Sequence, residues 1–222
     1  MDSSLLFSLR LSFQVAVIAT LFLLPVGIFV AYILAMKSFK GKDVVDTFLT
    51  LPLVLPPTVT GYYLVVILGR NGLLGKPLYE ATGISIMFTW YAAVFASFFV
   101  ALPIMIKTTK AAFESVDKNI INASYTLGHS EWETALKVVI PLAGKGIVAA
   151  TVLAFARALG EFGATLMFAG NIPGRTNTMP LAIYTAMTSG EYTKAHIMAG
   201  MFTLISGVCL YLANKLGRGS LR

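Results

Sequence analysis

The chain has 222 residues, of which 57% are hydrophobic and 12% charged, and its formal net charge at pH 7 is +7. A mean hydropathy of +0.79 exceeds that of soluble domains of this size, which excludes a soluble globular protein. Its Lys and Arg residues fall in particular loops and form no single basic patch, so the expected partner is the lipid bilayer and not nucleic acid.

Five segments are long and apolar enough to cross about 30 Å of hydrocarbon, which takes about 20 helical residues. They cover residues 11–36, 46–68, 84–106, 142–169 and 195–213. The first segment is too long and too apolar for a cleavable signal peptide, so we expect it to be retained as a helix. The sequence predicts an all-α polytopic membrane protein, with residues 1–222 forming one transmembrane domain.

The cations predict the orientation of this domain, because Lys and Arg are retained on the cytoplasmic side during insertion. If the polar loop at 107–141 is cytoplasmic, eleven cations lie on that face and five on the other, with Arg157 inside a span. The two sets are Lys37, Lys40, Lys42, Lys107, Lys110, Lys118, Lys137, Lys145, Lys215, Arg218 and Arg222, against Arg10, Arg70, Lys76, Arg175 and Lys194. This predicts an external N-terminus and a cytoplasmic C-terminus. A sixth span would spoil the agreement, so residues 172–190 are interpreted as an external loop carrying a short or re-entrant helix.

The second span contains Pro52, Pro56 and Pro57. Each removes a backbone donor and kinks or breaks a helix, which membranes tolerate where neighbours or water satisfy the freed carbonyls. Thr58 and Thr60 have two open interpretations. They either supply those hydrogen bonds or line a translocation path.

The polar loop between the third and fourth spans predicts two short helices. Asp117 can cap a helix that runs to Leu127, and Gly128 is the residue type that favours a helix end. Ser130 and Glu133 then have the S-x-x-E spacing of a capping box, so a second helix is expected to begin at Ser130.

The second helix is predicted to be amphipathic, because its apolar residues recur at three and four positions. The expected apolar stripe is Trp132, Ala135, Leu136 and Val139, with Glu131, Glu133, Thr134 and Lys137 facing elsewhere. Such a helix either lies on lipid headgroups or docks onto a soluble partner. The acidic first turn favours docking, since interfacial anchors usually present a polybasic face.

This loop resembles the signature loop of ABC importer permeases, which reads E-A-A, three residues, Gly, nine residues, Ile-x-Leu-Pro. The chain has Asn122, Ala123 and Ser124, then Gly128, and then Val138, Ile140 and Pro141 in the same register. Asn122 replaces the Glu and Ser124 replaces an Ala. The resemblance implies that residues 122–141, including Ser130 and Glu133, couple the permease to an ATPase.

A second resemblance narrows the family. FARALGEFGATLMFAGNIPGRTNTMP at 155–180 and LPLVLPPTVTGYYL at 51–64 are similar to the molybdate permease subunit of the ABC importers. The likeness implies a subunit that pairs with a second copy of itself, binds two cytoplasmic ABC ATPase subunits and receives an oxyanion from an external binding protein. Molybdate is the expected oxyanion, with tungstate and sulfate or thiosulfate as alternatives.

Arg157 and Glu161 are ionisable residues predicted deep inside the fourth span. Each costs about 2.5 to 3.5 kcal/mol at the bilayer centre, which implies a partner or a water-filled path. Four residues apart, the two side chains can pair on one helix face. Such a pair either fastens this helix to a neighbour or lines a gate where oxyanion binding must stay weak.

Small residues surround this predicted pair. Gly160 and Gly163 flank Glu161 and Phe162, which allows close helix crossing or a local break. Phe162 is a candidate plug of the gate, and its alternative is an ordinary packing aromatic. The external loop after this span is rich in turn-forming residues, and Arg175 within it is either a contact for the binding protein or a solvated cation.

The sequence predicts no enzymatic activity. It has no G-x-x-x-x-G-K-[ST] phosphate loop, and no cofactor or metal site is expected, because it has two His and one Cys. Two other classes remain as alternatives. A secondary transporter would need ionisable residues in several spans, and a membrane scaffold would need the docking helix without Arg157 and Glu161.

Overall fold

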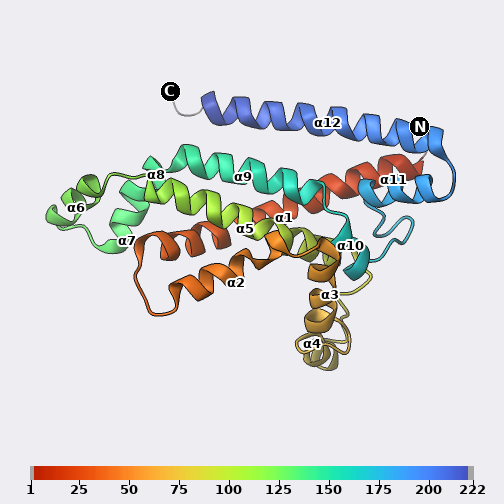
Figure 1. The fold of residues 1–222 in the computed structure, drawn as a ribbon, viewed down its shortest axis with the longest axis horizontal. Helices are drawn as coiled ribbons and strands as arrows, with labels where there is room; N and C mark the ends of the chain where they lie inside the picture. The colour runs from red at the N-terminus through yellow and green to blue at the C-terminus, as the bar shows by residue number, and fades with distance from the viewer. Residues whose placement is uncertain (1–2, 220–222) are drawn as a thin grey trace.

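The computed structural model describes residues 3–219 and is helical along most of this range. The long helices α1 (Ser3–Met36) and α5 (Trp90–Glu114) pack against each other and against α9 (Gly144–Leu159), as Figure 1 shows. The helix α12 (Tyr192–Gly219) lies along α9 on the outside of this bundle. Together these elements give the chain its membrane-spanning body.

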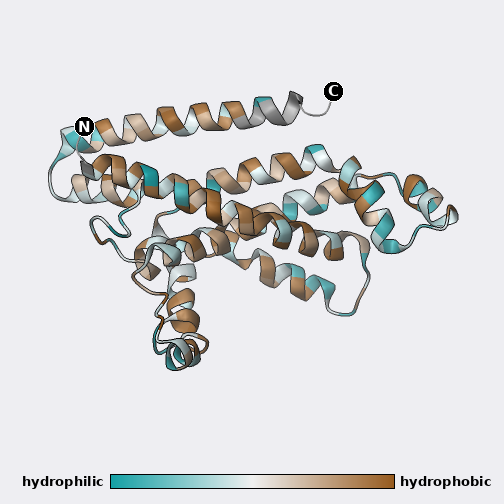
Figure 2. Ribbon diagram, turned by 180° about the vertical axis from the view of Figure 1, so that it is seen from behind, coloured by the Kyte–Doolittle hydropathy of each residue, from teal (hydrophilic) through white to brown (hydrophobic). Residues whose placement is uncertain are grey.

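Small residues allow the close packing of α1, α5 and α9. Alanines from all three helices are fully buried, and membrane helices associate through such surfaces because they let backbones approach. These alanines are Ala16, Ala19, Ala31, Ala92, Ala93, Ala96, Ala101, Ala150 and Ala154. The outer faces instead carry exposed large apolar side chains, as a bilayer requires, and Figure 2 shows this apolar body beside more polar ends.

Three helical segments are each long and apolar enough to cross a membrane, namely Ser4–Met36, Trp90–Glu114 and Tyr192–Leu212. Two bent pairs raise the number to five if each pair is one span. They are α2 (Lys42–Val54) with α3 (Pro57–Leu68), bent by 117°, and Glu131–Leu142 with α9, bent by 72°. The first, third and fifth predicted spans thus correspond to single helices and the second to a bent pair, whereas the other bent pair begins in the predicted polar loop and shares only α9 with the predicted fourth span, 142–169.

The boundaries differ from prediction where helices break. The second predicted span breaks at Leu55 and Pro56, and Pro52 is accommodated inside α2. The third begins at Trp90 and not at residue 84, because Thr89 caps α5 by accepting from the Ala92 N–H. The fourth is divided into α9 and α10 (Gly163–Phe168). Residues 172–190 contain one short helix, α11 (Met179–Thr188); Arg222 lies outside the described residues.

The shorter helices gather at different places in the bundle (Figure 1). At one end, α6 (Lys118–Thr126), α7 (Glu131–Thr134), the π-helical turn η1 (Ala135–Val139) and α8 (Ile140–Leu142) form a projection at residues 117–142, called the knob below. The helix α11 lies at the opposite end, near the start of α1, while α3 and α4 (Gly75–Thr82) extend away from the bundle. The knob and the loop before α11 are thus separated by the length of the bundle.

Candidate docking loop and membrane-interior site

The first helix of the knob is capped as the sequence predicts. The Asp117 side chain accepts a hydrogen bond of 2.8 Å from the Asn119 N–H at the start of α6. The helix ends at Thr126, and Gly128 follows with a φ of +85°. Glycine adopts this left-handed conformation without the strain that a side chain adds. Asn122 and Ala123 are exposed on α6.

The predicted capping box at Ser130 is confirmed. The Glu133 N–H donates to Ser130 Oγ over 3.3 Å, and the Ser130 N–H donates to Glu133 Oε2 over 2.9 Å. The hydrogen bond from the Ser130 backbone and the Lys137 ammonium 3.1 Å away lower the pKa of Glu133 to about 2. The second helix therefore has a fixed start with an ionised carboxylate.

A buried polar contact, which the sequence did not reveal, joins the two helices of the knob. The Ser124 and Thr134 hydroxyls lie 2.9 Å apart, and Ser124 Oγ lies 3.1 Å from His129 Nδ1. Ser124 and Thr134 are both buried, at 5% and 0% exposure. Ser124 stands where the resemblance has alanine, and that departure was the signal available in the sequence. The substitution thus adds a bond between α6 and α7.

The predicted single apolar stripe on the second helix is wrong. Ala135 and Val139 are buried, but Trp132 and Leu136 are 64% and 61% exposed. The chain makes a π-helical turn over Ala135–Val139, and its wider spacing separates residues that an α-helix would align. Thr134, expected on the polar side, faces inward instead. The result is a knob with a buried inner face and an exposed apolar outer face.

The outer face of the knob carries exposed apolar side chains. It includes Leu127, Trp132 and Leu136, with exposed fractions of 79%, 64% and 61%. Pro141 is also exposed, just before the chain bends into α9. Exposed large apolar residues on a polar projection make the knob a candidate interaction surface.

The second candidate site lies where α9 breaks. Gly160 ends α9, and Glu161 and Phe162 connect it to α10. An Arg157 guanidinium nitrogen lies 2.7 Å from Glu161 Oε2, and the exposed fractions of the two side chains are 29% and 1%. The predicted pairing is confirmed, as a close ion pair and not as an aligned hydrogen bond. It persists although the two residues do not share one continuous helix.

Glu161 has a second function in this break. Its Oε1 accepts a hydrogen bond of 2.8 Å from the Ala164 N–H, in the first turn of α10. A carboxylate at a helix start satisfies a free amide and interacts favourably with the helix dipole. One buried carboxylate therefore binds the end of α9 to the start of α10.

The two broken helices contact each other closely. A Cβ on Gly163 would lie 2.9 Å from the Cβ of Pro57, the first residue of α3. A Cβ on Gly61 would lie 2.9 Å from the Ala164 Cα and 2.7 Å from the Met167 Cβ. Only glycine fits at these two positions. The sequence had indicated Gly163 but not Gly61, because its neighbours Ala164 and Met167 are a hundred residues away.

The remaining interior candidates differ in their surroundings. Thr58 is exposed and Thr60 is buried. The Thr60 hydroxyl has no hydrogen-bond partner among the described residues, so the interpretation that it satisfies a carbonyl freed by proline is wrong. The Phe162 ring lies 5.2 Å from that of Tyr184 beside a hollow of about 430 Å³. Gly160 is exposed, and a side chain there would meet ordinary contacts only.

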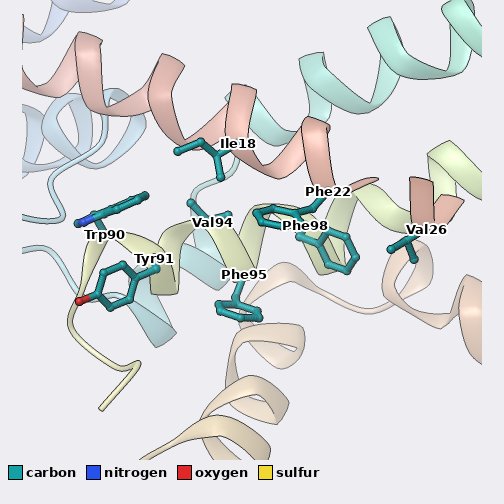
Figure 3. A pocket seen from close by; sticks show the side chains of 8 residues that line it. All are labelled: Ile18, Phe22, Val26, Trp90, Tyr91, Val94, Phe95 and Phe98. Carbon is teal, nitrogen blue, oxygen red and sulfur yellow. The ribbon is translucent and has the colours of Figure 1, made fainter. Parts of the chain in front are cut away.

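A separate hollow of about 420 Å³ lies between α1 and α5, as Figure 3 shows. Its lining is aliphatic and aromatic, with polar atoms only on Trp90 and Tyr91: Ile18, Phe22, Val26, Trp90, Tyr91, Val94, Phe95 and Phe98. A hollow without charge or converging donors cannot hold an anion. No three His, Cys, Asp or Glu side chains within residues 3–219 could hold a metal ion.

The loop between α10 and α11 is compact. Ile172 O accepts from the N–H groups of Arg175 and Thr176, and the buried Thr176 hydroxyl bonds back to Gly170 O over 3.1 Å. Arg175 is exposed at its turn. The loop therefore presents this cation on a fixed backbone.

Comparison with known proteins gives consistent matches along most of the chain. The profile of the family described as binding-protein-dependent transport system inner membrane component matches residues 23–218. The chain is 43% identical over 209 residues to the molybdenum transport system permease protein ModB of Escherichia coli K12, covering 94% of this chain and 91% of that protein. It is 41% identical to ModB of Haemophilus influenzae, covering 96% and 97%.

Solved structures resemble the fold. The inward-facing MetNI methionine ABC transporter matches with a TM-score of 0.79 at 14% sequence identity, with both chains fully covered. At that identity the match shows a shared fold.

Proposed function

The chain belongs to the family of binding-protein-dependent transport system inner membrane components, and from this premise we propose that it is the permease subunit of an ABC importer for molybdate. The observation that supports molybdate as the substrate is the chain's 43% identity to the molybdenum permease of Escherichia coli over 94% of its length. Tungstate and sulfate or thiosulfate are the alternatives, because these oxyanions share charge and shape with molybdate.

The proposed topology places the knob in the cytoplasm and the N-terminus outside, in one transmembrane domain over residues 1–222. The cation distribution of eleven against five supports this orientation. The positions of the knob and the loop before α11 at opposite ends of the bundle also support it (Figure 1). In this arrangement α12 returns the chain to the cytoplasmic side.

The knob is the proposed docking element for a cytoplasmic ATPase, two copies of which would serve a pair of permease subunits. Leu127, Trp132 and Leu136 supply an apolar surface for a cleft on that partner. The knob is shaped by the capping box of Ser130 and Glu133, the turn at Gly128 and the buried bond of Ser124. The proposed coupling residues also include three exposed ones, Asn122, Ala123 and Pro141. Because the chain has no phosphate loop of its own, the partner would hydrolyse ATP.

The break at Gly160, Glu161, Phe162 and Gly163 is the proposed gate region. Its contact with Pro57 and Thr58 ties α10 to α3, so tilting of α9 would move both short helices. Arg157, itself paired with Glu161, would attract an oxyanion only weakly, and weak transient binding is what transport requires. Thr58 and Thr60 are proposed to line the path.

Arg175 on its fixed loop is the proposed contact for the external binding protein, which would deliver the anion to a dimer of this chain with a second copy. An exposed cation suits an acidic rim on such a partner. Nucleotide-driven closure of the ATPases would move the knob and expose the path alternately to each face.

Uptake into vesicles tests the proposal. The chain is reconstituted with its ATPase and binding protein, ATP is enclosed, and radiolabelled molybdate uptake is measured beside sulfate. We expect uptake that requires ATP, the ATPase and the binding protein. Uptake driven by an ion gradient alone would establish a secondary transporter, and absence of uptake with all partners present would leave a scaffold.

A further inference from the structure

We infer that α1 is a strut that transmits displacement between the loop before α11 and the knob. The inference rests on the proposed function, which assigns these two surfaces to the binding protein and to the ATPase. Lys37 and Glu131 at one end of α1, and Ser8 and Ser12 at the other, are its positioning residues.

The knob end of the strut is an ion pair between distant segments. Lys37 directly follows α1, and its Nζ lies 2.5 Å from each carboxylate oxygen of Glu131, the first residue of α7. Asp46 of α2 pairs with Lys107 and Lys110 of α5 across 61 and 64 residues, and other exposed ion pairs, such as Lys76 with Glu80, join residues three or four apart. The Lys37 pair instead spans 94 residues. It therefore joins the end of α1 to the start of α7.

Besides this ion pair, Tyr32 of α1 also interacts with Glu131. A hollow of about 330 Å³ lies between Met36 at the end of α1 and Ile121, Asn122 and Tyr125 of α6. Few backbone contacts link these elements. Both side chains of the ion pair are nearly half exposed, at 47% and 43%, and such pairs add little to folding stability. Removing the ion pair should therefore weaken the transmission of displacement from α1 to the knob far more than it lowers folding stability.

The opposite end of α1 is held by buried hydrogen bonds. Ser8 Oγ donates to Asn177 Oδ1 over 2.7 Å, and the Met179 N–H donates to Ser12 Oγ over 2.7 Å. Both serines are 2% exposed. Asn177 and Met179 directly follow the compact turn that carries Arg175. A displacement of that turn is thus passed to α1 through two short hydrogen bonds, of which the one between Met179 and Ser12 is buried.

The body of α1 can carry such a displacement. It is one uninterrupted helix of 34 residues, which is about 51 Å long at 1.5 Å per residue. Pro25 lies inside it without dividing it. Coupling between two sites needs an element whose position both sites bias, and α1 contacts both.

The test measures how strongly the ligand-loaded binding protein stimulates ATP hydrolysis by the reconstituted complex. Lys37→Glu should reduce this stimulation at least about fivefold, the lower range of coupling effects between sites. The exchanged pair, Lys37→Glu with Glu131→Lys, should restore most of it. Lys76→Glu is the matched control, because it reverses a cation in an exposed pair far from α1, and it should leave stimulation unchanged.

A second variant tests the other end. Ser12→Ala should also reduce this stimulation. Combined with Lys37→Glu it should add almost nothing, because each substitution alone already interrupts the same path through α1. Full stimulation of the Lys37→Glu variant, failure of the exchanged pair to recover, or multiplied losses in the combination would each overturn the strut. Absence of ATP-driven uptake by the unchanged chain would overturn the proposed function and the strut with it.

Discussion

The knob and the break between α9 and α10 are both interruptions of helix, but they are held together differently. The caps and the buried hydroxyl contact of the knob join residues within about ten positions, such as Asp117 with Asn119 and Ser124 with Thr134, although Lys37 also reaches the knob from the end of α1. The break depends on residues far apart in sequence, such as Gly163 against Pro57. A locally stabilised projection can move as a unit, whereas a break packed against another element moves only together with it.

This difference predicts a clear division among variants. Changes at the break should lower the stability of the whole membrane body, because its contacts join α3, α9 and α10. Changes in the knob should leave the body folded and act on coupling or on the knob alone.

The largest expected effect comes from Arg157→Ala. Glu161 would remain 1% exposed without a compensating charge, and breaking a buried ion pair in this way costs about 3 to 5 kcal/mol. The free energy of unfolding in mixed micelles, measured by denaturant titration, should fall by that amount.

A double variant provides the control for this prediction. Arg157→Met with Glu161→Gln removes both charges and keeps an oxygen that can accept from the Ala164 N–H, so it should recover most of the loss. If Arg157→Ala were as stable as the unchanged chain, the ion pair would have to be solvated. The break would then, like the knob, tolerate substitution without loss of stability in the membrane body.

A smaller loss is expected from Gly61→Ala. The added Cβ would meet backbone of Ala164 at 2.9 Å, and overpacking of this kind costs about 1 to 3 kcal/mol. The same titration measures it. Gly207→Ala is the matched control, because a Cβ there meets nothing within 4 Å, and it should not destabilise the chain. Equal effects of the two substitutions would argue against close packing of α3 on α10.

The contrast also explains which parts of the fold could be predicted from sequence. Apolar stretches identify candidate spans because the bilayer sets their length, and this holds for α1, α5 and α12. The bend at Leu55 and Pro56 was only partly predictable. Prolines indicate that a helix weakens, but the 117° angle depends on α10 packing beside Pro57.

The site residues follow the same division. Caps and left-handed turns obey local rules, so Asp117, Gly128 and Ser130 were predicted correctly. The stripe over Trp132–Val139 was not, because a π-helical turn changes the residue spacing that the periodicity assumed. The Glu161 bond to Ala164 and the contacts of Gly61 depend on tertiary structure, and no local pattern indicates them.

In the knob, Gly128→Pro should uncouple ATP hydrolysis from uptake while the protein remains folded in the membrane. Proline cannot adopt the φ of +85° found at this position, so the angle between α6 and α7 must change. Uptake per ATP hydrolysed in vesicles is the measurement. Gly128→Asn is the control, because asparagine tolerates the left-handed region, and it should keep coupling near normal. Coupled transport by the proline variant would refute the role of the knob.

The smallest expected effect is a pH dependence confined to the capping box. Hydrogen bonds from Ser130 and Lys137 lower the pKa of Glu133 from its ordinary value of 4.5 to about 2, so its ionised form stabilises the start of α7. That contribution is fully present above about pH 4.5 and is lost as the pH falls toward 2. Amide hydrogen exchange at Ser130, which donates to this carboxylate, should lose protection over that interval, after correction for the intrinsic pH dependence of exchange. Glu133→Gln, which keeps an acceptor but cannot ionise, should have weaker protection that does not change with pH between 5 and 2. An equal pH response in both proteins would assign the titration to another group. It would refute the claim that ionised Glu133 stabilises the start of α7.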